Sequence, residues 1–292
     1  MSDTRALVTG AAGQLGSELT ALLGGSGEVL AADHQQLDIA DDDAVAARIA
    51  EFAPTLVLNC AAFHNVDQCE TEEDRSFEIN VRAVKRLAEA CATAGAKLVH
   101  FSTNYVFDGT AAEPYTEQDP PAPRSIYAIS KLAGEQAALA YAPGALVVRS
   151  SGLYGLRGSE SKGGNFVTRM VARARDQGAL RMVADQHLTP TFTVDLAQAV
   201  VDAADSGADG VLHLTNDGAC SWYEFTQAIM DIAGIDVPIE PVNTDVGPGI
   251  TQRPRNGVLR SVRAAGLGVP PLRPWRAALE DYMERAGLAA GA

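Results

Sequence analysis

The chain has 292 residues, of which 47% are hydrophobic and 21% charged, which excludes a disordered chain and allows one large domain or two smaller ones. Its formal net charge of −14 opposes nucleic-acid binding, and no apolar run approaches the roughly 20 residues that span a membrane. The first residues lead into a strand-like run without the features of a secretory signal, so we expect a cytoplasmic protein.

The cysteines and histidines are not arranged as metal ligands. The four cysteines show no C-x-x-C pairing and stand in apolar or helical contexts, which is typical of reduced, buried thiols. The five histidines are scattered, without i, i+4 pairing or a cysteine at ligand spacing. We therefore expect no catalytic metal.

Short strand-like runs alternate with helical patterns through the first half of the chain. The runs are nearly uninterrupted apolar stretches, as a parallel sheet covered on both faces requires. This order predicts an α/β fold, a doubly wound parallel sheet of the Rossmann type, over residues 1–150. Strands are expected at residues 5–10, 28–33, 55–62, 97–103 and 145–151, and helices at 13–24, 41–52, 72–95 and 125–142.

The alternation weakens after Ser150. Residues 152–166 are glycine-rich and polar, which favours a loop or lid over a site. Residues 151–292 are expected to form a smaller C-terminal α/β substrate-binding lobe, with parts of 190–215 joining the first domain. The elements expected there are helices at 166–178, 194–205, 222–234 and 275–286 and strands at 180–185 and 210–215.

A glycine triplet, Gly10, Gly13 and Gly16, follows the first strand. Glycines at such a turn let the backbone approach a pyrophosphate, whose charge then lies at the N-terminus of the next helix. The spacing is G-x-x-G-x-x-G rather than G-x-G-x-x-G, so the prediction of a dinucleotide site rests on its place between a strand and a helix. A structural turn without a ligand is the alternative.

Asp33 ends the second expected strand, twenty residues after Gly13. Its carboxylate is placed to accept hydrogen bonds from the adenosine ribose and to repel a 2′-phosphate, and no arginine follows at positions 34–36 to hold that phosphate. NAD(H) is therefore favoured over NADP(H). Asp38 and Ile39 are candidates to reach the adenine. The alternatives are an exposed turn aspartate at position 33 and a helix cap at position 38.

The sharpest local signal is Tyr127-Ala-Ile-Ser-Lys131. Positions i and i+4 of a helix share one face about 6 Å apart along the axis, so the ammonium can lie near the phenol. A neighbouring cation favours the phenolate, and we expect Lys131 to move the pKa of Tyr127 toward the range of proton exchange with a carbonyl or alcohol. Tyr and Lys at this spacing also occur together by chance.

Ser102 and Thr103 stand at the end of the fourth expected strand. Ligands of open α/β sheets bind beyond the carboxyl ends of the strands. One of these hydroxyls is thus placed to hydrogen-bond a reacting carbonyl oxygen and stabilise its developing charge. Ordinary turn capping is the alternative.

Taken together, these residues resemble an extended short-chain dehydrogenase/reductase, and more narrowly the dTDP-4-dehydrorhamnose reductase group of sugar-nucleotide 4-ketoreductases. The likeness covers nearly the whole chain. It is carried by GAAGQLG, LDI at 37–39, NCAAFHNVD, Asn80-Val81, STNYVFDG, YAISKLAGE, VRSSGLYG, GNF at 164–166, DQHLTPT and RPRN.

The resemblance implies NAD(P)H-dependent reduction of the C4 ketone of a nucleotide-activated deoxysugar. Thr103, Tyr127 and Lys131 would be the catalytic trio, with Lys131 also holding the nicotinamide ribose. The residues lining or supporting the cofactor site would be Gly10, Gly13, Gln14, Leu15, Gly16, Asp33, Asp38, Ile39, Ala61, Ala62, Asn80 and Ser102, besides Tyr127 and Lys131. The sugar nucleotide would meet Asn104, Tyr105, Gly152, Asn165 and Arg253.

Two positions depart from the family pattern. Asn104 stands where the family usually has aspartate, and it gains a donor but cannot take up a proton at neutral pH. Gly152 stands where a tryptophan is common, so we expect a wider or differently shaped sugar pocket. The hypothesis is that reduction survives and the preferred sugar has changed. Arg253, with Arg255, Arg260 and Arg263, forms a basic cluster in the sequence that could bind a diphosphate or be a solvated face.

Other functions of the same fold stay open. Asn104-Tyr105 follows the threonine where dehydratases carry an Asp-Glu pair, so dehydration is disfavoured, whereas an epimerase using the same trio is harder to exclude. A non-catalytic dinucleotide-binding regulator, resembling the regulatory subunit of methionine adenosyltransferase, is the alternative from another class. Family members are often homodimers, some bridged by magnesium, and no stretch of this sequence establishes either feature.

Overall fold

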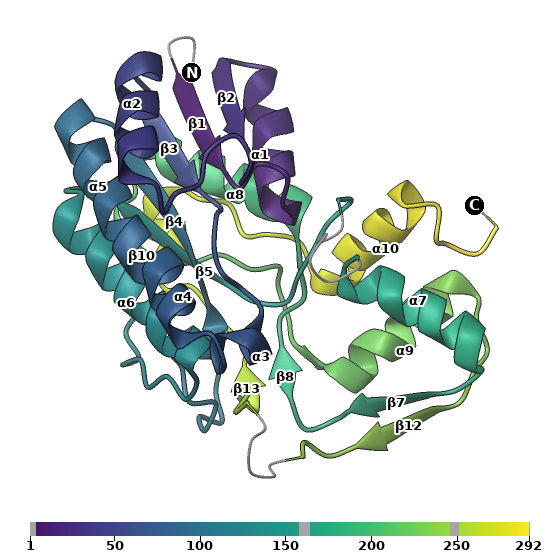
Figure 1. The fold of residues 1–292 in the computed structure, drawn as a ribbon. Coiled ribbons are helices and arrows are strands. Elements are labelled where there is room, and N and C mark those ends of the chain that lie inside the picture. The colour runs from purple at the N-terminus through teal and green to yellow at the C-terminus, as the bar shows by residue number, and fades with distance from the viewer. Residues whose placement is uncertain (1–3, 158–163, 246–250, 292) are drawn as a thin grey trace.

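A six-stranded, all-parallel sheet forms the centre of the larger lobe (Figure 1) in the computed structural model, which describes residues 4–157, 164–245 and 251–291. The spatial order is β2-β1-β3-β4-β5-β10, so the chain reverses direction across the sheet between β1 and β3, where ligands of doubly wound folds bind. The predicted α/β fold is confirmed. The strands are β1 (Arg5–Thr9), β2 (Glu28–Ala32), β3 (Leu56–Asn59), β4 (Lys97–Thr103), β5 (Leu146–Ser150) and β10 (Gly210–His213).

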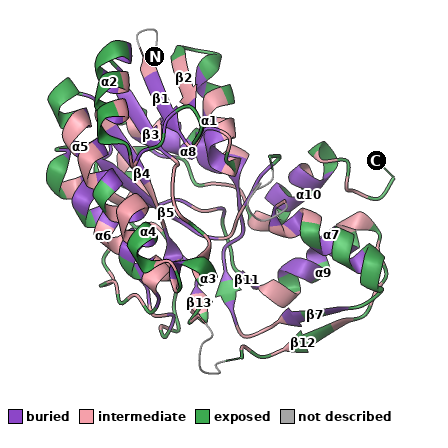
Figure 2. Cartoon of the chain, viewed as in Figure 1, coloured by how far each residue is buried: buried purple, intermediate pink, exposed green. Residues whose placement is uncertain are grey.

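Helices cover both faces of this sheet and bury its strands (Figure 2). One face packs against α1 (Gln14–Gly24) and α8 (Thr193–Asp205). The other packs against α2 (Asp42–Phe52), α5 (Ala83–Ala94) and α6 (Ile126–Tyr141). Both α8 and β10 come from the second half of the chain, and β10 pairs with β5 at the edge of the sheet.

The helix predicted over residues 72–95 has an irregular centre. It consists of α4 (Glu73–Phe77), a π-helical turn η1 (Glu78–Arg82) and then α5. Inserted π turns are frequent at functional sites. This one carries Asn80, whose amide both accepts from the backbone N–H of Phe63 and donates to its carbonyl, at 2.9 Å each. Asn80 therefore fixes the loop after β3.

The smaller lobe has its own core, built around Tyr154, Phe192, Phe225 and Tyr282. Its helices are α7 (Phe166–Gln177), α9 (Trp222–Ala233) and α10 (Trp275–Arg285), beside the parallel pair β7 (Leu180–Val183) and β12 (Ile239–Val242). Among the described residues, no helix is long and apolar enough to cross a membrane.

Several short elements were not predicted, because segments of two to four residues show no periodicity. One of them, at Leu153–Tyr154, lies inside the predicted lid, of which residues 158–163 fall outside the described residues. The unpredicted elements are α3 (Val66–Cys69), η2 (Asn104–Val106), β6 (Leu153–Tyr154), β8 (His187–Leu188), β9 (Thr191–Phe192), β11 (Cys220–Ser221), β12, β13 (Asn256–Gly257) and η4 (Ala264–Leu267).

Candidate active site

The glycine loop after β1 is closed so tightly that side chains would not fit. Gly10 has φ +63°, and a Cβ there would lie 2.7 Å from the backbone nitrogen of Ala61. At Gly16 a Cβ would overlap the carbonyl oxygen of Gly10 and lie 2.9 Å from the Cα of Ala11. The loop is therefore built from backbone alone, as close approach to a phosphate requires.

The N-terminus of α1 lies at this loop. Gly13 is its N-cap, no side chain caps it, and its first turn has no acidic residue. Free N–H groups and the helix dipole make such an end attractive to an anion. The buried Oε1 of Gln14 has no hydrogen-bond partner among the described residues, whereas Leu15 is packed in the core. The loop thus fits a dinucleotide pyrophosphate.

The acidic residues after β2 stabilise their own turns. Asp33 Oδ1 accepts from the backbone N–H groups of Gln35 and Gln36 at 2.9 Å, while its Oδ2 has no hydrogen-bond partner in the described chain. Asp38 is exposed, and its Oδ1 accepts from Ala40 N at 2.9 Å. Ile39 is buried. Asp33 therefore keeps one carboxylate oxygen for a ribose, and Asp38 also has the turn-stabilising role that was its alternative.

Thr103 and Tyr127 meet where β4 ends, and Lys131 contacts the backbone of the same strand. The hydroxyls of Thr103 and Tyr127 share a hydrogen bond. Lys131, one turn after Tyr127 on α6, donates from Nζ to the carbonyl oxygen of Phe101 at 2.6 Å. Ser125 caps α6, accepting from Ala128 N at 3.2 Å. The three side chains thus face the carboxyl edge of the sheet, next to the loop in which Gly10 abuts residues 60 and 61.

Burial dominates the titration of both ionisable members of the trio. It raises the pKa of Tyr127 above its usual value, opposed by the hydrogen bond from Thr103. Burial also lowers the pKa of Lys131 to about 8, although the Glu135 carboxylate opposes this shift. The expectation that Lys131 lowers the pKa of Tyr127 is wrong for this structure, because desolvation of the phenol outweighs any nearby charge. Tyr127 keeps its proton at neutral pH.

Ser102 joins a buried ion pair on the α6 side of the sheet. Its hydroxyl donates to Glu135 Oε1, and Arg149 binds the same carboxylate through Nε at 2.9 Å and Nη2 at 2.6 Å. Glu135 and Arg149 are 0% and 3% exposed. The hydroxyl of Ser102 is thus engaged by Glu135 in this structure, and its assignment to the cofactor stays a prediction.

Glu135 and Arg149 were not singled out from the sequence, although a signal was present. Glu135 follows Lys131 by four residues, so Tyr127, Lys131 and Glu135 form one row along α6. Arg149 lies inside an apolar strand, where a charged residue requires a partner. A buried charge in a strand beside such a row would have predicted this pair.

Asn104 ties the end of β4 to the distant segment 251–263. Its Nδ2 donates to the carbonyl oxygen of Gly257 at 3.0 Å, and its Oδ1 accepts from Thr103 Oγ1 at 3.3 Å. The side chain is 5% exposed. An aspartate has no donor for the Gly257 carbonyl. The asparagine is thus explained by a structural contact, and it lies against a member of the trio.

Two of the predicted sugar-binding residues have structural contacts of their own, and their assignment to the sugar stays a prediction. Gly152 has φ +57°, and a Cβ there would lie 2.6 Å from Cδ1 of Leu188. Leu188 therefore occupies the space that the loss of a side chain was expected to open. Asn165 forms the capping box of α7 with Thr168, and its Nδ2 donates to Gly155 O and Tyr282 Oη. Its amide donors are used in the smaller lobe.

Tyr105 packs against Tyr127 of the trio, and Arg253 lies near Tyr105. The Tyr105 ring packs edge-to-face on Tyr127, with centroids 5.6 Å apart, and the Arg253 charge opposes the burial that raises the pKa of Tyr105. Arg253 Nη2 binds the Asp67 carboxylate at 3.0 Å. The basic cluster seen in the sequence is dispersed: Arg255 lies near Asp185, and Arg263 binds Asp209 and the Val211 carbonyl, while Arg260 pairs through its backbone with Tyr115.

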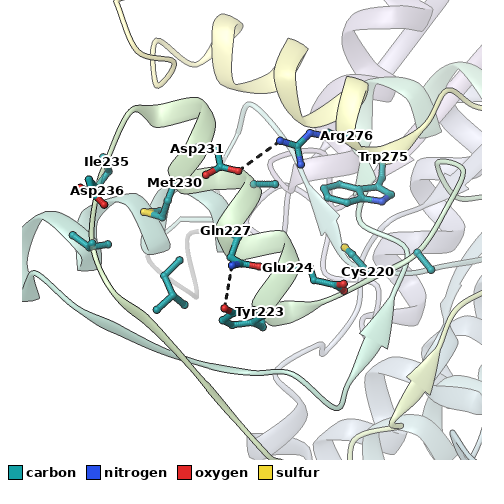
Figure 3. Close-up of a pocket in the computed structure, with 14 residues that line it drawn as sticks. Cys220, Tyr223, Glu224, Gln227, Met230, Asp231, Ile235, Asp236, Trp275 and Arg276 are labelled. Atoms are coloured by element: carbon teal, nitrogen blue, oxygen red, sulfur yellow. Dashed lines mark hydrogen bonds and ion pairs between the residues drawn. The ribbon is translucent and has the colours of Figure 1, made fainter.

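A separate hollow of about 550 Å³ lies in the smaller lobe, beside α9 (Figure 3). Its polar groups bind one another: Gln227 Nε2 donates to Tyr223 Oη at 3.0 Å, and Arg276 lies 3.7 Å from Asp231. None of the trio lines it. Within the described residues, no group of three or more His, Cys, Asp or Glu side chains could hold a metal ion.

The doubly wound sheet, the glycine loop and the trio define a short-chain dehydrogenase/reductase. The family model described as RmlD substrate binding domain matches residues 4–287. The spore coat polysaccharide biosynthesis protein SpsK of Bacillus subtilis is 40% identical over 96% of this chain and 97% of its own. A dTDP-4-dehydrorhamnose reductase of Mycobacterium tuberculosis is 41% identical over 94% and 91%.

Solved structures agree. A dTDP-4-dehydrorhamnose reductase from Clostridium acetobutylicum superposes with a TM-score of 0.92 at 40% identity, covering 97% of this chain and 99% of that one. A second, from Bacillus anthracis in complex with NADP, gives 0.91 at 33% identity over the same shares. The chain belongs to the RmlD substrate-binding domain family, within the extended short-chain dehydrogenases/reductases.

Proposed function

We propose that this protein reduces the C4 ketone of a nucleotide-activated deoxysugar, using a reduced nicotinamide cofactor. The observation that carries the proposal is the hydrogen bond between Thr103 and Tyr127 at the end of β4, with Lys131 bound to the same strand, beside a glycine loop that only backbone fills. Relatives that are about 40% identical along nearly the whole chain are named 4-ketoreductases of dTDP-sugars. A reduced nicotinamide, when bound, supplies the hydride.

The residues of this chain supply the rest of the chemistry. Tyr127, protonated at neutral pH, donates its proton to the carbonyl oxygen as that oxygen gains charge. Thr103, hydrogen-bonded to the same phenol, steadies that oxygen with its hydroxyl. Lys131, one turn further along α6, is assigned to the nicotinamide ribose, as the resemblance to the family implies. A raised phenol pKa suits this direction of reaction, because reduction needs the acid form first.

The deciding experiment offers the purified protein a panel of 4-keto nucleotide sugars, including dTDP-4-dehydrorhamnose, each with NADH and NADPH. Cofactor oxidation is followed by absorbance and the product configuration by NMR. We expect stoichiometric oxidation with at least one ketosugar, and oxidation about 10²- to 10⁴-fold slower with Tyr127→Phe. Cofactor binding without oxidation of any substrate would instead identify a binding subunit, and C4 inversion without net oxidation would identify an epimerase.

The panel also tests the sugar preference. If dTDP-4-dehydrorhamnose is reduced as efficiently as any other ketosugar, the hypothesis of a changed substrate fails. The hypothesis was based partly on the space that a glycine at position 152 would leave. The Leu188 side chain occupies that space, so this part of the argument is weaker. Asn104 remains a difference close to the reacting group, since it contacts Thr103.

We further propose NAD(H) as the preferred cofactor. What supports this is the carboxylate oxygen of Asp33 that has no hydrogen-bond partner in the described chain, together with the absence of an arginine from the His34-Gln35-Gln36 that follows it. A 2′-phosphate beside that carboxylate suffers repulsion. Asp33→Ala should therefore raise kcat/KM for NADPH relative to NADH by about tenfold or more, equivalent to about 1.4 kcal/mol. An unchanged ratio would refute the assignment.

A further inference from the structure

A row of buried polar side chains crosses the sheet directly beneath the trio. Thr9 of β1 pairs in register with Asn59 of β3, which pairs in register with His100 of β4. Thr9 Oγ1 lies 2.7 Å from Asn59 Oδ1, Asn59 Nδ2 lies 3.1 Å from His100 Nδ1, and His100 Nε2 lies 3.5 Å from Lys131 Nζ. All four residues are at most 3% exposed. The row connects the strand end before Gly10 to the lysine of the site.

This row can pair with either charge state of Lys131. In the first order, Thr9 donates to the Asn59 oxygen and the Asn59 amide donates to Nδ1 of His100. Neutral His100 then carries its proton on Nε2 and presents a donor to an uncharged Lys131. In the second order, the Asn59 amide is turned over, so that its oxygen accepts from Nδ1 of His100. Nε2 of His100 then accepts from the charged ammonium of Lys131. Both orders keep His100 and Asn59 paired, since an imidazole and an amide each have a donor end and an acceptor end.

The surroundings of His100 keep it neutral. Burial, then the charge of Lys131, hold the pKa of His100 well below its usual value. The titratable groups that face Lys131 are His100 on β4, Glu135 on α6, Cys60 after β3 and Cys69 on α3. Of these, Glu135 is engaged by Ser102 and Arg149. His100 is therefore the group whose hydrogen-bonding end can change to match the lysine.

We propose that His100 is a positioning residue for Lys131, and that the Thr9–Asn59–His100 row lets this lysine be charged or neutral without leaving a buried polar group unpaired. Nothing in the proposed chemistry at the substrate requires His100 to touch sugar or cofactor. The inference rests on the proposed function only in that Lys131 serves the reduction. The hydrogen-bonded row itself does not depend on the substrate.

The first test compares three variants. His100→Leu removes both ring nitrogens, His100→Gln keeps a donor and an acceptor on one side chain, and His213→Gln is the control. His213, on β10, is likewise buried, and burial lowers its pKa to about 4. Its imidazole contacts the carbonyl oxygen of Tyr115 and not Lys131. We expect His100→Leu to lower kcat about tenfold or more, change the sugar KM little and shift the pH profile limb of Lys131.

His100→Gln should recover most of that loss, and His213→Gln should leave the profile in place. The proposal is overturned if His100→Leu and His213→Gln lower activity only in step with their melting temperatures and neither moves the pH profile. That result would make His100 an ordinary core residue.

The second test needs no turnover. The ¹⁵N shifts of the imidazoles report which ring nitrogen carries the proton, and His100→Gln assigns the His100 signals among the five histidines. We expect His100 to stay neutral from pH 5.5 to 9 and to change tautomer as Lys131 titrates, and this change to vanish in Lys131→Met. A His100 that protonates near pH 6.5, or that ignores Lys131→Met, overturns the proposal. If the His100 tautomer follows the titration of Lys131 but the protein reduces no ketosugar, the role of His100 is retained and the proposed function is refuted.

Discussion

The two halves of the candidate site are built differently. In the cofactor half, the restricting contacts are backbone to backbone: Gly16 against Gly10, and Gly10 against Ala61. In the sugar half, side chains reach across the fold, as Asn104 does to Gly257 and Asn165 to Tyr282, 153 and 117 positions away. The first half is specified by local residue types. The sugar half is specified by contacts between distant segments of the chain. Its polar side chains therefore hold the structure together and are not available to a ligand alone.

Tyr127 lies where the two halves meet, so its loss should have the largest effect. Tyr127→Phe removes the proton donor and leaves the ring that packs on Tyr105. We expect kcat to fall by about 10²- to 10⁴-fold, with cofactor affinity nearly unchanged. Steady-state kinetics and a cofactor titration measure the two. Turnover that survives at the wild-type level would remove the trio from the mechanism.

The buried pair below the trio belongs to neither half, and breaking it should reduce stability rather than binding. Arg149→Met leaves the Glu135 carboxylate buried without its partner, which should cost about 3–5 kcal/mol in the free energy of unfolding. The double variant Arg149→Met, Glu135→Leu should recover part of this loss. Denaturant unfolding of the three proteins measures the effect, and an Arg149→Met protein as stable as wild type would contradict it.

The cofactor half is tested by a matched pair of glycines in α1. Gly16→Ala places a Cβ against the Gly10 carbonyl, whereas nothing lies within 4 Å of a Cβ at Gly24. Overpacking of this kind costs about 1–3 kcal/mol, so we expect Gly16→Ala to weaken cofactor binding by roughly 5- to 150-fold. Gly24→Ala should bind normally. Equal affinities for both variants would mean that the loop is looser than the structure has it.

The sugar half is tested at Asn104. Asn104→Asp removes the donor to the Gly257 carbonyl and sets two acceptors face to face, at a cost of about 1–3 kcal/mol in stability. If Asn104→Asp prefers a different sugar from the wild-type protein, the asparagine governs substrate choice. A variant that is merely less stable, with an unchanged sugar preference, would confine Asn104 to its structural contact.

The smallest effect expected is a slope of stability with pH. The pKa of Lys131 is lowered to about 8 in the folded protein, so between pH 8 and its unfolded value the unfolded chain binds more protons. Stability contributed by Lys131 should therefore rise with pH in that window, by at most about 1.4 kcal/mol per pH unit. The free energies of unfolding of wild type and Lys131→Met, measured across this pH range, isolate the contribution of Lys131. A difference that stays flat from pH 8 to 10 would argue against a desolvated ammonium.

What could be predicted from the sequence follows the same division. The parallel sheet, its helices and the glycine loop follow from periodicity and from residue types that act within a few positions. The row Tyr127, Lys131, Glu135 was within reach through helical spacing, although only its first two members were identified. The role of Asn165 as a cap and the filling of the space beside Gly152 by Leu188 depend on contacts between distant segments, which no local pattern encodes.

The bond of Glu135 to both Ser102 and Arg149 has a consequence for how the protein fails on heating. It joins α6 to β4 and β5 in the interior, so the spacing between Tyr127 and Thr103 is set by elements that separate only when the larger lobe melts. Thermal inactivation should then coincide with the cooperative unfolding of that lobe, with no earlier phase in which an intact fold has lost its chemistry.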